Sequence, residues 1–575
     1  MQNNQCLHII IIINIFKYTK IGVLVVAMIT ISACEEFLNR PTEDSYTIDS
    51  FYKTDQQCFQ AANVLYNAPW YDFQRGFVSI GDVLPGNLYR STDNAYQNFN
   101  LTSSDADLAN ASNSLWLVNG HCNAVIENIA KKAGSAVSQT TKNTVTGEAM
   151  VWKAMAYFYL VRGWGAIPII HSNSDVIGAG TANQLKKNKV EDVYEYIVRT
   201  LNKAIELLPA QNARGRIDKY AAYGLLSKVY LTRSGWGQNG TRKQADLDKA
   251  KEYAAKVIKE SPAKLEPIYG NLFRISTGNF NSENLLSWRW IASDQWTSQN
   301  TLQSDLSLNG FTGLADSWGS WVGPTIDLVS LFGDTAVSKT RNNYDTRRKA
   351  TAMMYSDYYP YFWRHKGGFT ATWDDTNIAG ATFGIGTGAN CVKHIVGHYD
   401  GDHTAESGVP AQRMATDLAT HVLRLADVYL IYAEAALGNS ASTSDAEALR
   451  LYNAVRRRAI PIWTDAVSIT FNDIFNERRR EFACEGDNWY DFVRLSYYNS
   501  ALAKSKLNAQ QRGSFSGLSE LYKGTGTAVI LNSFKVNITD DKKFRIPFPE
   551  VDLAMNPNLM DNVEPVAFDF TSIGY

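Results

Sequence analysis

The stretch IFNERRREFACEGDNWYDFVR, residues 474–494, combines a dense run of charges with aromatic side chains. Three consecutive arginines stand at 478–480, and a glutamate stands on each side of them. The arginines alone would suggest a basic patch, but helical spacing brings the glutamates beside them, where opposite charges attract. The run therefore predicts a helix with a salt-bridged face. Trp489 and Asp491 are expected to pack and to pair locally.

Helical periodicity continues on both sides of this stretch. Apolar residues recur every three or four positions in several segments, which is typical of amphipathic helices. The predicted helices cover residues 150–161, 193–208, 222–231, 247–258, 423–437, 446–459 and 471–485. Short links between neighbouring segments favour antiparallel pairs that stack into a helical-repeat scaffold.

The helical pattern fades between about residues 262 and 415, a region rich in Gly, Trp, Tyr, Asn and Asp. Long irregular loops inside a folded protein are usually functional. We therefore expect one mostly α-helical domain over residues 34–575, with its scaffold at about 147–260 and 417–495. Ligand-binding residues are expected in the loop-rich region 262–415 and in an early loop at 81–100.

The charge balance excludes one class of partner. Lys and Arg number 56 against 57 Asp and Glu, so the formal net charge of the 575 residues is −1. Without a basic excess the chain has no means of holding a phosphate backbone, and nucleic acid is not expected as a partner. Aromatic residues reach 12%, with 14 Trp and 30 Tyr, enough for both a core and a stacking surface.

The N-terminus has the layout of a secretory signal. Residues 21–33 form an uncharged apolar run, preceded by Lys17 and Lys20. As a helix this run would be about 20 Å long, short of the roughly 30 Å hydrocarbon core of a bilayer. ISAC, residues 31–34, resembles the lipobox of bacterial lipoproteins, which predicts removal of 1–33 and acylation of Cys34.

The alternative is a transmembrane anchor through residues 6–33. It would place Lys17 and Lys20 inside the bilayer, at a cost of roughly 2.5–3.5 kcal/mol each at the centre of the membrane. We therefore favour the lipoprotein. The acidic residues at 35–36 resemble the export signal that directs such lipoproteins to the outside of the cell. Four further cysteines lie far apart and are expected to be buried free thiols, namely Cys58, Cys122, Cys391 and Cys484.

Six stretches, taken in order, resemble the SusD/RagB family of outer-membrane nutrient-binding lipoproteins, and together they span nearly the whole mature chain. They are FLNRPTEDSYTIDSFYKTDQQC (37–58), GEAMVWKAMAYFYLVRGWGAIPII (147–170), HVLRLADVYLIYAEAAL (421–437), LRLYNAVRRRA (449–459), the stretch at 474–494, and FRIPFPEVDLAMNPNL (544–559). The chain departs from the family pattern at its end, where MDNVEPVAFDFTSIGY (560–575) follows the closing motif.

The resemblance implies an α-helical fold built on four tetratricopeptide-like helix pairs, with the irregular middle packed alongside. Members of the family sit as lids on a SusC-like TonB-dependent outer-membrane transporter and deliver oligosaccharides, or in some branches peptides, for import. They are not enzymes. The resemblance therefore implies three partners for this chain: a glycan ligand, such a transporter, and the outer membrane through a lipid anchor.

Glycan capture needs flat aromatic faces for sugar rings and planar polar groups for their hydroxyls. The early loop GDVLPGNLYRSTDNAYQNFN (81–100) has this mixture, and its candidate binding residues are Tyr89, Arg90 and Tyr96. By the resemblance, family ligand sites draw on an early loop and a central loop. This carries over to the present chain by region only, since no strict motif marks the residues.

The central loop has two candidate stretches, SWRWIASDQWTSQN (287–300) and ADSWGSWVGP (315–324). They offer Trp296, Trp318 and Trp321 as glycan-binding residues. The last two can serve binding or packing equally well, because an exposed aromatic and a core aromatic look alike in sequence. A groove rich in Trp favours sugar as the ligand, whereas an open groove of backbone donors would favour peptide.

In the same region, Trp288 and Trp290 alternate with polar residues after an apolar pair. Alternation of this kind is typical of a half-buried strand, whose apolar side chains all point to one face. We therefore predict that these two tryptophans belong to the core and not to the binding surface.

A surface glycoside hydrolase is the competing class of function. Such enzymes need two carboxylates at a fixed separation across the bond, which a sequence does not reveal. The chain has neither a Gly-x-Ser-x-Gly elbow nor a His-Glu-x-x-His motif. GIGTG (384–388) lacks the Lys-Ser/Thr of a phosphate-binding loop and is expected to be a flexible loop.

The stretch HIVGHYDGDH (394–403) raises the question of a metal site. On a helix His394 and His398 would share a face, as zinc ligands do. Asp400 and Asp402 could offer oxygens to calcium, although the twelve-residue calcium-loop pattern is absent. We expect the polar residues of a surface loop and no cofactor, with bound calcium as the open alternative.

Overall fold

The computed structural model describes residues 51–575, apart from 92, 293–295, 315–321, 334–344, 373–387, 413, 518–519, 521–522 and 527–528. Three of the candidate residues, Cys34, Trp318 and Trp321, lie outside the described residues. None of the helices in the described part combines the length and apolar character needed to cross a bilayer.

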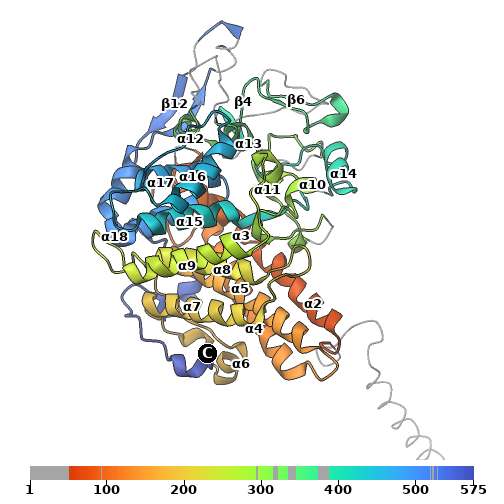
Figure 1. The fold of residues 1–575 in the computed structure, drawn as a ribbon, viewed down its shortest axis with the longest axis vertical. Helices are drawn as coiled ribbons and strands as arrows, with labels where there is room; N and C mark the ends of the chain where they lie inside the picture. Colours follow the sequence, from red (N-terminus) through yellow and green to blue (C-terminus); the bar gives the residue numbers. More distant parts are fainter. Residues whose placement is uncertain are drawn as a thin grey trace, which may run out of the picture.

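Long α-helices dominate the described chain. They are α4 (Ala106–Lys132), α5 (Gln139–Trp164), α7 (Val190–Leu207), α8 (Lys219–Arg233), α9 (Gln244–Glu260), α15 (Leu425–Leu437), α16 (Ala446–Ala459), α17 (Phe471–Phe482) and α18 (Asn488–Ala509). Each of α4, α5, α7, α8, α9 and α15 packs on the next, and α15 also packs on α16 and α17. Figure 1 shows these helices in successive layers, so the predicted mostly α fold is confirmed.

Local signals explain where these helices begin and end. At α17, Thr470 and Asp473 form a capping box that satisfies backbone N–H groups of the first turn. At α5, the Ser138 hydroxyl accepts a bond from the Thr141 N–H, and the helix stops at Gly165, whose φ is 80°. Helix α7 buries an apolar stripe at Val193, Ile197, Leu201 and Ala204.

Short elements fill the rest of the described chain. The short α-helices are α2 (Asp55–Asn63), α3 (Phe73–Val78), α6 (Asn173–Ala179), α10 (Ile275–Gly278), α11 (Leu302–Leu306), α12 (Ile326–Leu331), α13 (Arg347–Thr351), α14 (Gly401–Ser407) and α20 (Glu550–Met555). From residue 262 to 415 the longest described helix is α14, with seven residues. This region packs beside the long helices (Figure 1).

Strands occur as antiparallel pairs. They are β1 (Leu88–Tyr89) with β3 (Gly323–Pro324), β2 (Asn284–Trp288) with β8 (Thr420–Arg424), β4 (Ala352–Met354) with β7 (Ala389–Cys391), β5 (Tyr358–Tyr359) with β6 (Phe369–Thr370), β9 (Ser442–Thr443) with β10 (Ile469–Thr470), and β11 (Arg512–Ser516) with β12 (Val529–Phe534). Trp288 and Trp290 are 0% and 4% exposed, which confirms that they belong to the core. The four cysteines are also buried free thiols, as predicted.

The salt-bridged face of α17 exists, and it faces the interior. Glu481 accepts bonds from Arg347 at 2.8 Å, from Arg424 at 2.9 Å and from Arg458. Burial opposes ionisation of Glu481, but the guanidinium groups outweigh it and hold the pKa of this carboxyl well below its usual range. We call the buried group around α17 the charge network; its members are Glu283, Asp345, Arg347, Lys393, Arg424, Arg456, Arg458, Glu477, Glu481 and Glu485.

The residues that follow α17 also behave as the sequence predicts. Asp491 accepts from Arg478 at 2.9 Å and from Arg494 at 2.9 Å. Trp489 is fully buried, with its ring stacked on Phe544 at a centroid distance of 6.0 Å. The stretch 474–494 therefore builds the interior of the fold and presents no ligand-binding surface.

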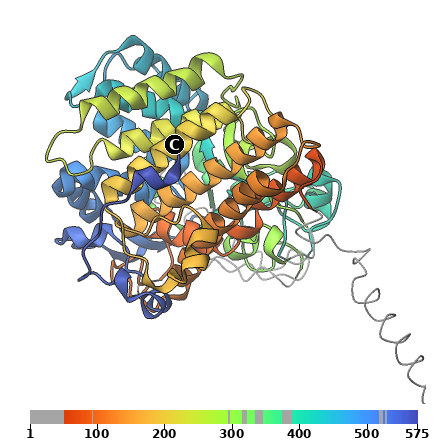
Figure 2. The same ribbon diagram turned by 90° about the horizontal axis from the view of Figure 1, so that it is seen from below.

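The residues that follow the closing motif pack on helix α7. The Val566 N–H donates to the Lys187 carbonyl, and the Phe568 ring meets Tyr196 edge-on at 5.8 Å. The Arg199 guanidinium lies 4.5 Å from the centroid of Phe570. Figures 1 and 2 show the C-terminus against the long helices. The extra segment thus covers a helical face of the scaffold.

Candidate functional site

Trp296 is the exposed aromatic of the central loop. It starts the short 3₁₀-helix η6 (Trp296–Ser298), and 48% of its surface is exposed. The Tyr71 ring lies beside it, with 5.9 Å between the centroids and 57° between the planes. A hollow of about 310 Å³ opens here, which we call the Trp296 hollow; it is lined by Tyr71, Asp72, Gln74, Arg75, Asn110, Trp296, Thr301, Asp305 and Met414.

Buried amides hold the two sides of this hollow together. Gln74, on α3, accepts a bond from the Thr301 N–H at 3.0 Å and donates to the Gln299 carbonyl at 3.3 Å. Asn300 donates to the Leu418 carbonyl at 2.8 Å. Because these amides are almost fully buried, they fix the chain directly after Trp296 against α3.

An arginine forms the polar wall of the hollow. Arg75 donates from Nε and Nη2 to the two carboxylate oxygens of Asp305, at 3.3 and 3.0 Å. The Asp305 side chain is 3% exposed, whereas that of Arg75 is 51% exposed. A bidentate pair of this kind orients the planar guanidinium. The two bonds hold the guanidinium in one orientation at the surface. Its Nη1 takes part in neither of them.

Arg90 belongs to the same face of the molecule. It pairs with Asp107 at 3.5 Å, and 38% of its side chain is exposed. Burial is the largest single influence on the pKa of Arg75 and lowers it, but Asp305 and, to a smaller extent, Asp107 together outweigh burial and raise it. Asp107 therefore lies close to both arginines. The fold brings Arg90 of the early loop and Trp296 of the central loop to one charged surface.

Two other candidates of the early loop are buried. Tyr96 is 1% exposed and donates its hydroxyl proton at 2.6 Å to Asp105, which caps helix α4. Tyr89 is 4% exposed and pairs with Gly323 in the β1–β3 ladder. Neither ring has an exposed face for a sugar, because both serve local packing, and we leave them out of the proposed surface.

Several residues of the hollow were not among the sequence-derived candidates. Tyr71 lies in the turn before α3, Arg75 lies on α3, and Asn110 and Asp305 come from α4 and α11. Burial, followed by Asp72 and Asp305, raises the pKa of Tyr71 well above its usual value, so its hydroxyl keeps its proton and can donate. Because Tyr71 precedes the helix, helical spacing does not connect it with Arg75, and the sequence pattern did not indicate the pair.

The histidines of 394–403 do not share a helix face. His394 has a φ of 72°, and its Nε2 meets the Cys484 carbonyl at 2.7 Å. Burial lowers the pKa of His394 to about 4. Asp402 accepts bonds from the backbone N–H groups of Trp363, Arg364 and His398. Among the described residues, no group of three His, Cys, Asp or Glu side chains could hold a metal ion.

The chain was compared with protein families and with known proteins, and both comparisons found matches. A sequence model of the SusD family matches residues 288–564, and one described as "Starch-binding associating with outer membrane" matches 36–231. A SusD-like protein of Bacteroides ovatus is 33% identical over 581 residues, covering 97% of this chain and 100% of the relative. SusD-like protein P2 of Formosa agariphila is 26% identical, covering 73% and 74% of the two chains.

Solved structures agree with these matches. A crystal structure described as containing a xylogluco-oligosaccharide is 32% identical, covers 89% of this chain and 99% of that chain, and has a TM-score of 0.76. A laminarin-binding SusD-like protein shares the fold at 20% identity and a TM-score of 0.62, covering 88% and 98%. The order of motifs, the fold and the close relative agree, and the chain belongs to the SusD family.

Proposed function

We propose that this protein binds an oligosaccharide or polysaccharide at the Trp296 hollow and passes it, uncleaved, to a SusC-like TonB-dependent outer-membrane transporter. A lipid on Cys34 holds it at the cell surface in this proposal. One observation carries the glycan site: an exposed tryptophan and a tyrosine lie beside an arginine that a bidentate ion pair fixes in place.

The chemistry of the hollow suits a sugar. Trp296 offers a rigid apolar face for the C–H side of a pyranose ring, and Tyr71 extends it. Arg75 and Asn110 offer donors to hydroxyl oxygens, while Asp72 offers an acceptor. Asp305 is committed to Arg75 and acts by orienting it. These contacts bind a neutral ligand without changing its bonds.

Family membership supports a glycan as the ligand. The crystallised relative that contains a xylogluco-oligosaccharide is 32% identical along almost its entire length. Because part of the lining, including Trp296, comes from the irregular middle of the chain, and loops vary most among relatives, the particular glycan does not carry over with the fold. We therefore propose the class of ligand and leave its linkage to experiment.

Delivery to a transporter would compensate for weak binding at a few stacked rings. A lipid anchor confines the protein to the membrane surface, and docking raises the effective concentration of the captured glycan. A single acyl chain gives only marginal attachment, so the proposal includes more than one acyl chain at the N-terminal cysteine.

The lipid anchor is tested by the Cys34→Ala variant. We expect this variant to lose membrane attachment, measured by cell fractionation, and to keep glycan binding. A Cys34→Ala protein that stays uncleaved and membrane-bound would instead support a transmembrane anchor through residues 6–33.

The glycan site is tested by native affinity electrophoresis of residues 35–575 against a polysaccharide panel, with analysis of reducing ends. We expect retardation on at least one glycan without release of sugar, and loss of retardation in Trp296→Ala. Tyr358→Ala is the matched control, because Tyr358 is 46% exposed and lies outside the hollow. Trp318→Ala and Trp321→Ala test whether the rest of the central loop contributes.

Each contrary outcome has a definite meaning. Released sugar would identify a hydrolase and contradict the proposal. Absence of retardation on every glycan would contradict a sugar ligand and favour peptide capture. Full retardation of Trp296→Ala would show that the glycan binds elsewhere on the molecule.

A further inference from the structure

A second hollow lies where strand β2 ends, on the other side of the chain from the buried Trp288 and Trp290. Its volume is about 300 Å³, at the lower end of the size of small-molecule pockets, roughly 300–1,000 Å³. We call it the Arg289 hollow; the polar and aromatic residues that matter here are Asn212, Arg214, Arg216, Phe280, Asn284 and Arg289.

Arg289 has no anionic partner among the described residues. Its Nε and Nη1 atoms are buried without a hydrogen-bond acceptor. Burial lowers the pKa of Arg289 to about 10; Tyr66 opposes this shift, and the nearby charge of Arg214 adds a smaller lowering. A buried donor without an acceptor costs roughly 1–3 kcal/mol, and more when it is charged.

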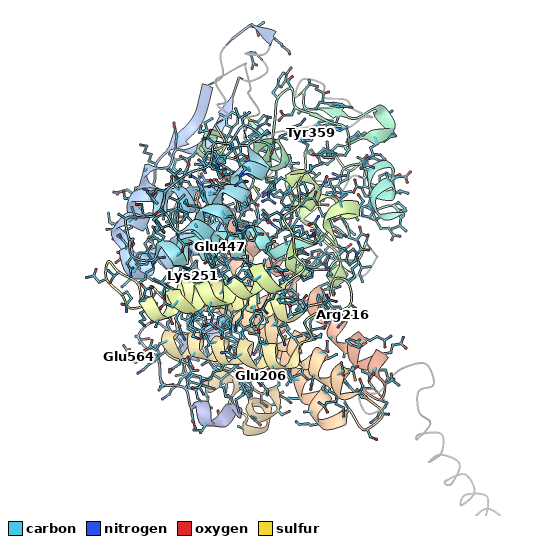
Figure 3. The ribbon with its side chains drawn as sticks, in the orientation of Figure 1. Glu206, Arg216, Lys251, Tyr359, Glu447 and Glu564 are labelled. Atoms are coloured by element: carbon cyan, nitrogen blue, oxygen red, sulfur yellow. The ribbon has the colours of Figure 1, made fainter. Side chains whose placement is uncertain are left out.

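Arg216 lines the same hollow and, unlike Arg289, has hydrogen-bond acceptors for its guanidinium. Arg216 donates from Nε and Nη2 to the two oxygens of Glu148, at 2.8 and 2.5 Å. It also donates to Asn63 at 2.6 Å and stacks on Phe59 of α2. Figure 3 labels Arg216 at this edge of the helical scaffold. The Glu148 carboxylate is therefore taken by Arg216, and the Asp218 carboxylate, which also lines the hollow, accepts from the backbone N–H groups of Tyr220 and Ala221.

A second cation and an open floor complete the hollow. The guanidinium carbons of Arg214 and Arg289 lie 4.6 and 4.7 Å from the centroid of Phe280. Gly215, with a φ of 84°, lies close to Phe280 and Arg289. A Cβ at this position would come within 2.7 Å of the Phe280 ring and 3.5 Å of Arg289 Nε. Glycine thus keeps open the space in front of the unpaired donors.

An unpaired acceptor lies in the same hollow. The Oδ1 atom of Asn284 is buried and has no donor in the described part of the chain, although its amide nitrogen donates to Ser287 at 2.9 Å. A ligand that carries an anionic oxygen pair and a hydroxyl group would satisfy both Arg289 and Asn284. A sugar acid has both, whereas an inorganic anion such as sulfate offers no hydroxyl donor.

We propose that the Arg289 hollow binds the carboxylate of an acidic sugar, with Arg289 as its cationic hydrogen-bond donor, Arg214 as a second cation and Asn284 as acceptor for a ring hydroxyl. The anion site stands on the geometry alone, and the assignment of its ligand as a sugar rests on the proposed glycan-binding function. The site is distinct from the Trp296 hollow, because the two share no lining residue.

The test uses the full-length protein purified in detergent, with sodium D-glucuronate, D-glucose and sodium sulfate as probes at matched ionic strength. Binding is measured by calorimetry and by the shift of Tm. We expect glucuronate to bind and to raise Tm, and glucose and sulfate to do so at least tenfold more weakly. Arg289→Gln should weaken glucuronate binding about 10- to 100-fold, the loss expected for hydrogen bonds to a charged group.

Two controls separate this site from a structural role and from the Trp296 hollow. Without ligand, Arg289→Gln should unfold at the same temperature as the parent protein or higher, because it removes a buried unpaired charge. Arg450→Gln, which removes an exposed arginine on α16, should leave glucuronate binding unchanged. Trp296→Ala should lose the neutral glycan and keep glucuronate.

Several results would overturn the inference. If glucuronate binds no better than glucose, or equally well to Arg289→Gln, the hollow does not take a sugar acid. If sulfate binds as well as glucuronate, the site is a general anion site and the sugar assignment is wrong. If Arg289→Gln lowers Tm in the absence of ligand, the arginine has a structural role. None of these results bears on neutral glycan binding at Trp296, so the two proposals fail separately.

Discussion

The arginines of the charge network and the arginine of the Arg289 hollow differ in their partners. Arg424 meets three carboxylates, those of Glu283, Glu481 and Glu485, at distances between 2.6 and 2.9 Å. Arg289 meets none among the described residues. Since an uncompensated buried charge costs free energy, the first arrangement stabilises the fold, whereas the second leaves donors that a ligand could satisfy.

Breaking the charge network should have the largest effect. Glu481→Gln leaves Arg347, Arg424 and Arg458 with one negative charge fewer among them. Removing one partner of a buried ion pair costs about 3–5 kcal/mol of unfolding free energy. Chemical denaturation followed by circular dichroism measures the loss. A change below about 1 kcal/mol would show that the buried pairs do not support the fold.

Lowering the pH should have the second-largest effect on the free energy of unfolding. Burial lowers the pKa values of His394 and His421 to about 4, against about 6.5 in an unfolded chain. Their stabilisation is thus complete above pH 6.5 and is lost as the pH falls toward 4, at about 1.4 kcal/mol per pH unit for each residue. Urea midpoints between pH 7.5 and 4.5 measure this slope. His394→Gln should reduce it, and an unchanged slope would assign the acid sensitivity to other groups.

The polar wall of the Trp296 hollow offers a smaller perturbation. Arg75→Lys keeps the charge near Asp305 but removes the bidentate geometry that orients the guanidinium. We expect glycan affinity to fall about tenfold, with less than about 1 kcal/mol lost in stability. Arg199→Lys, at a glutamate-paired site on α7, should leave affinity unchanged. Equal affinity of Arg75→Lys and the parent protein would remove Arg75 from the site.

An exposed ion pair should matter least. Glu447 and Arg450 form an i,i+3 pair on α16, with side-chain exposures of 31% and 53% (Figure 3 labels Glu447). Glu447→Gln should change the unfolding free energy by about 0.5 kcal/mol or less, because water and salt screen such pairs. This variant is therefore the matched control for Glu481→Gln. A loss of several kcal/mol here would remove the contrast between buried and exposed pairs.

One long helix, α4, was not indicated by the sequence, and its buried polar residues explain why. The scaffold was expected to begin near residue 147, but α4 already starts at Ala106. Helix α4 buries polar side chains along with apolar ones: Ser114 donates to the Pro69 carbonyl, and Asn123 donates to the Ile170 carbonyl. Buried serines and asparagines interrupt the apolar periodicity on which a helix prediction depends. Their partners become known only when the chain is folded.

The candidate site shows the same limit. Trp296 was chosen for its aromatic ring in a polar loop, and it is exposed. Tyr96 was chosen on the same grounds, yet it is buried because its hydroxyl finds Asp105. An aromatic side chain packs equally well in a core and on a binding face, so its residue type does not distinguish the two.

The sequence by itself determined the family, the mostly helical fold and the pairing of charges along 474–494, because periodicity and charge spacing act between residues that are near one another in the chain. Only the tertiary structure decided that those charges face the interior, that Tyr71, Arg75 and Trp296 meet at one hollow, and that two donors of Arg289 have no acceptor among the described residues. These properties depend on burial and on contacts between distant segments, which arise only when the chain has folded.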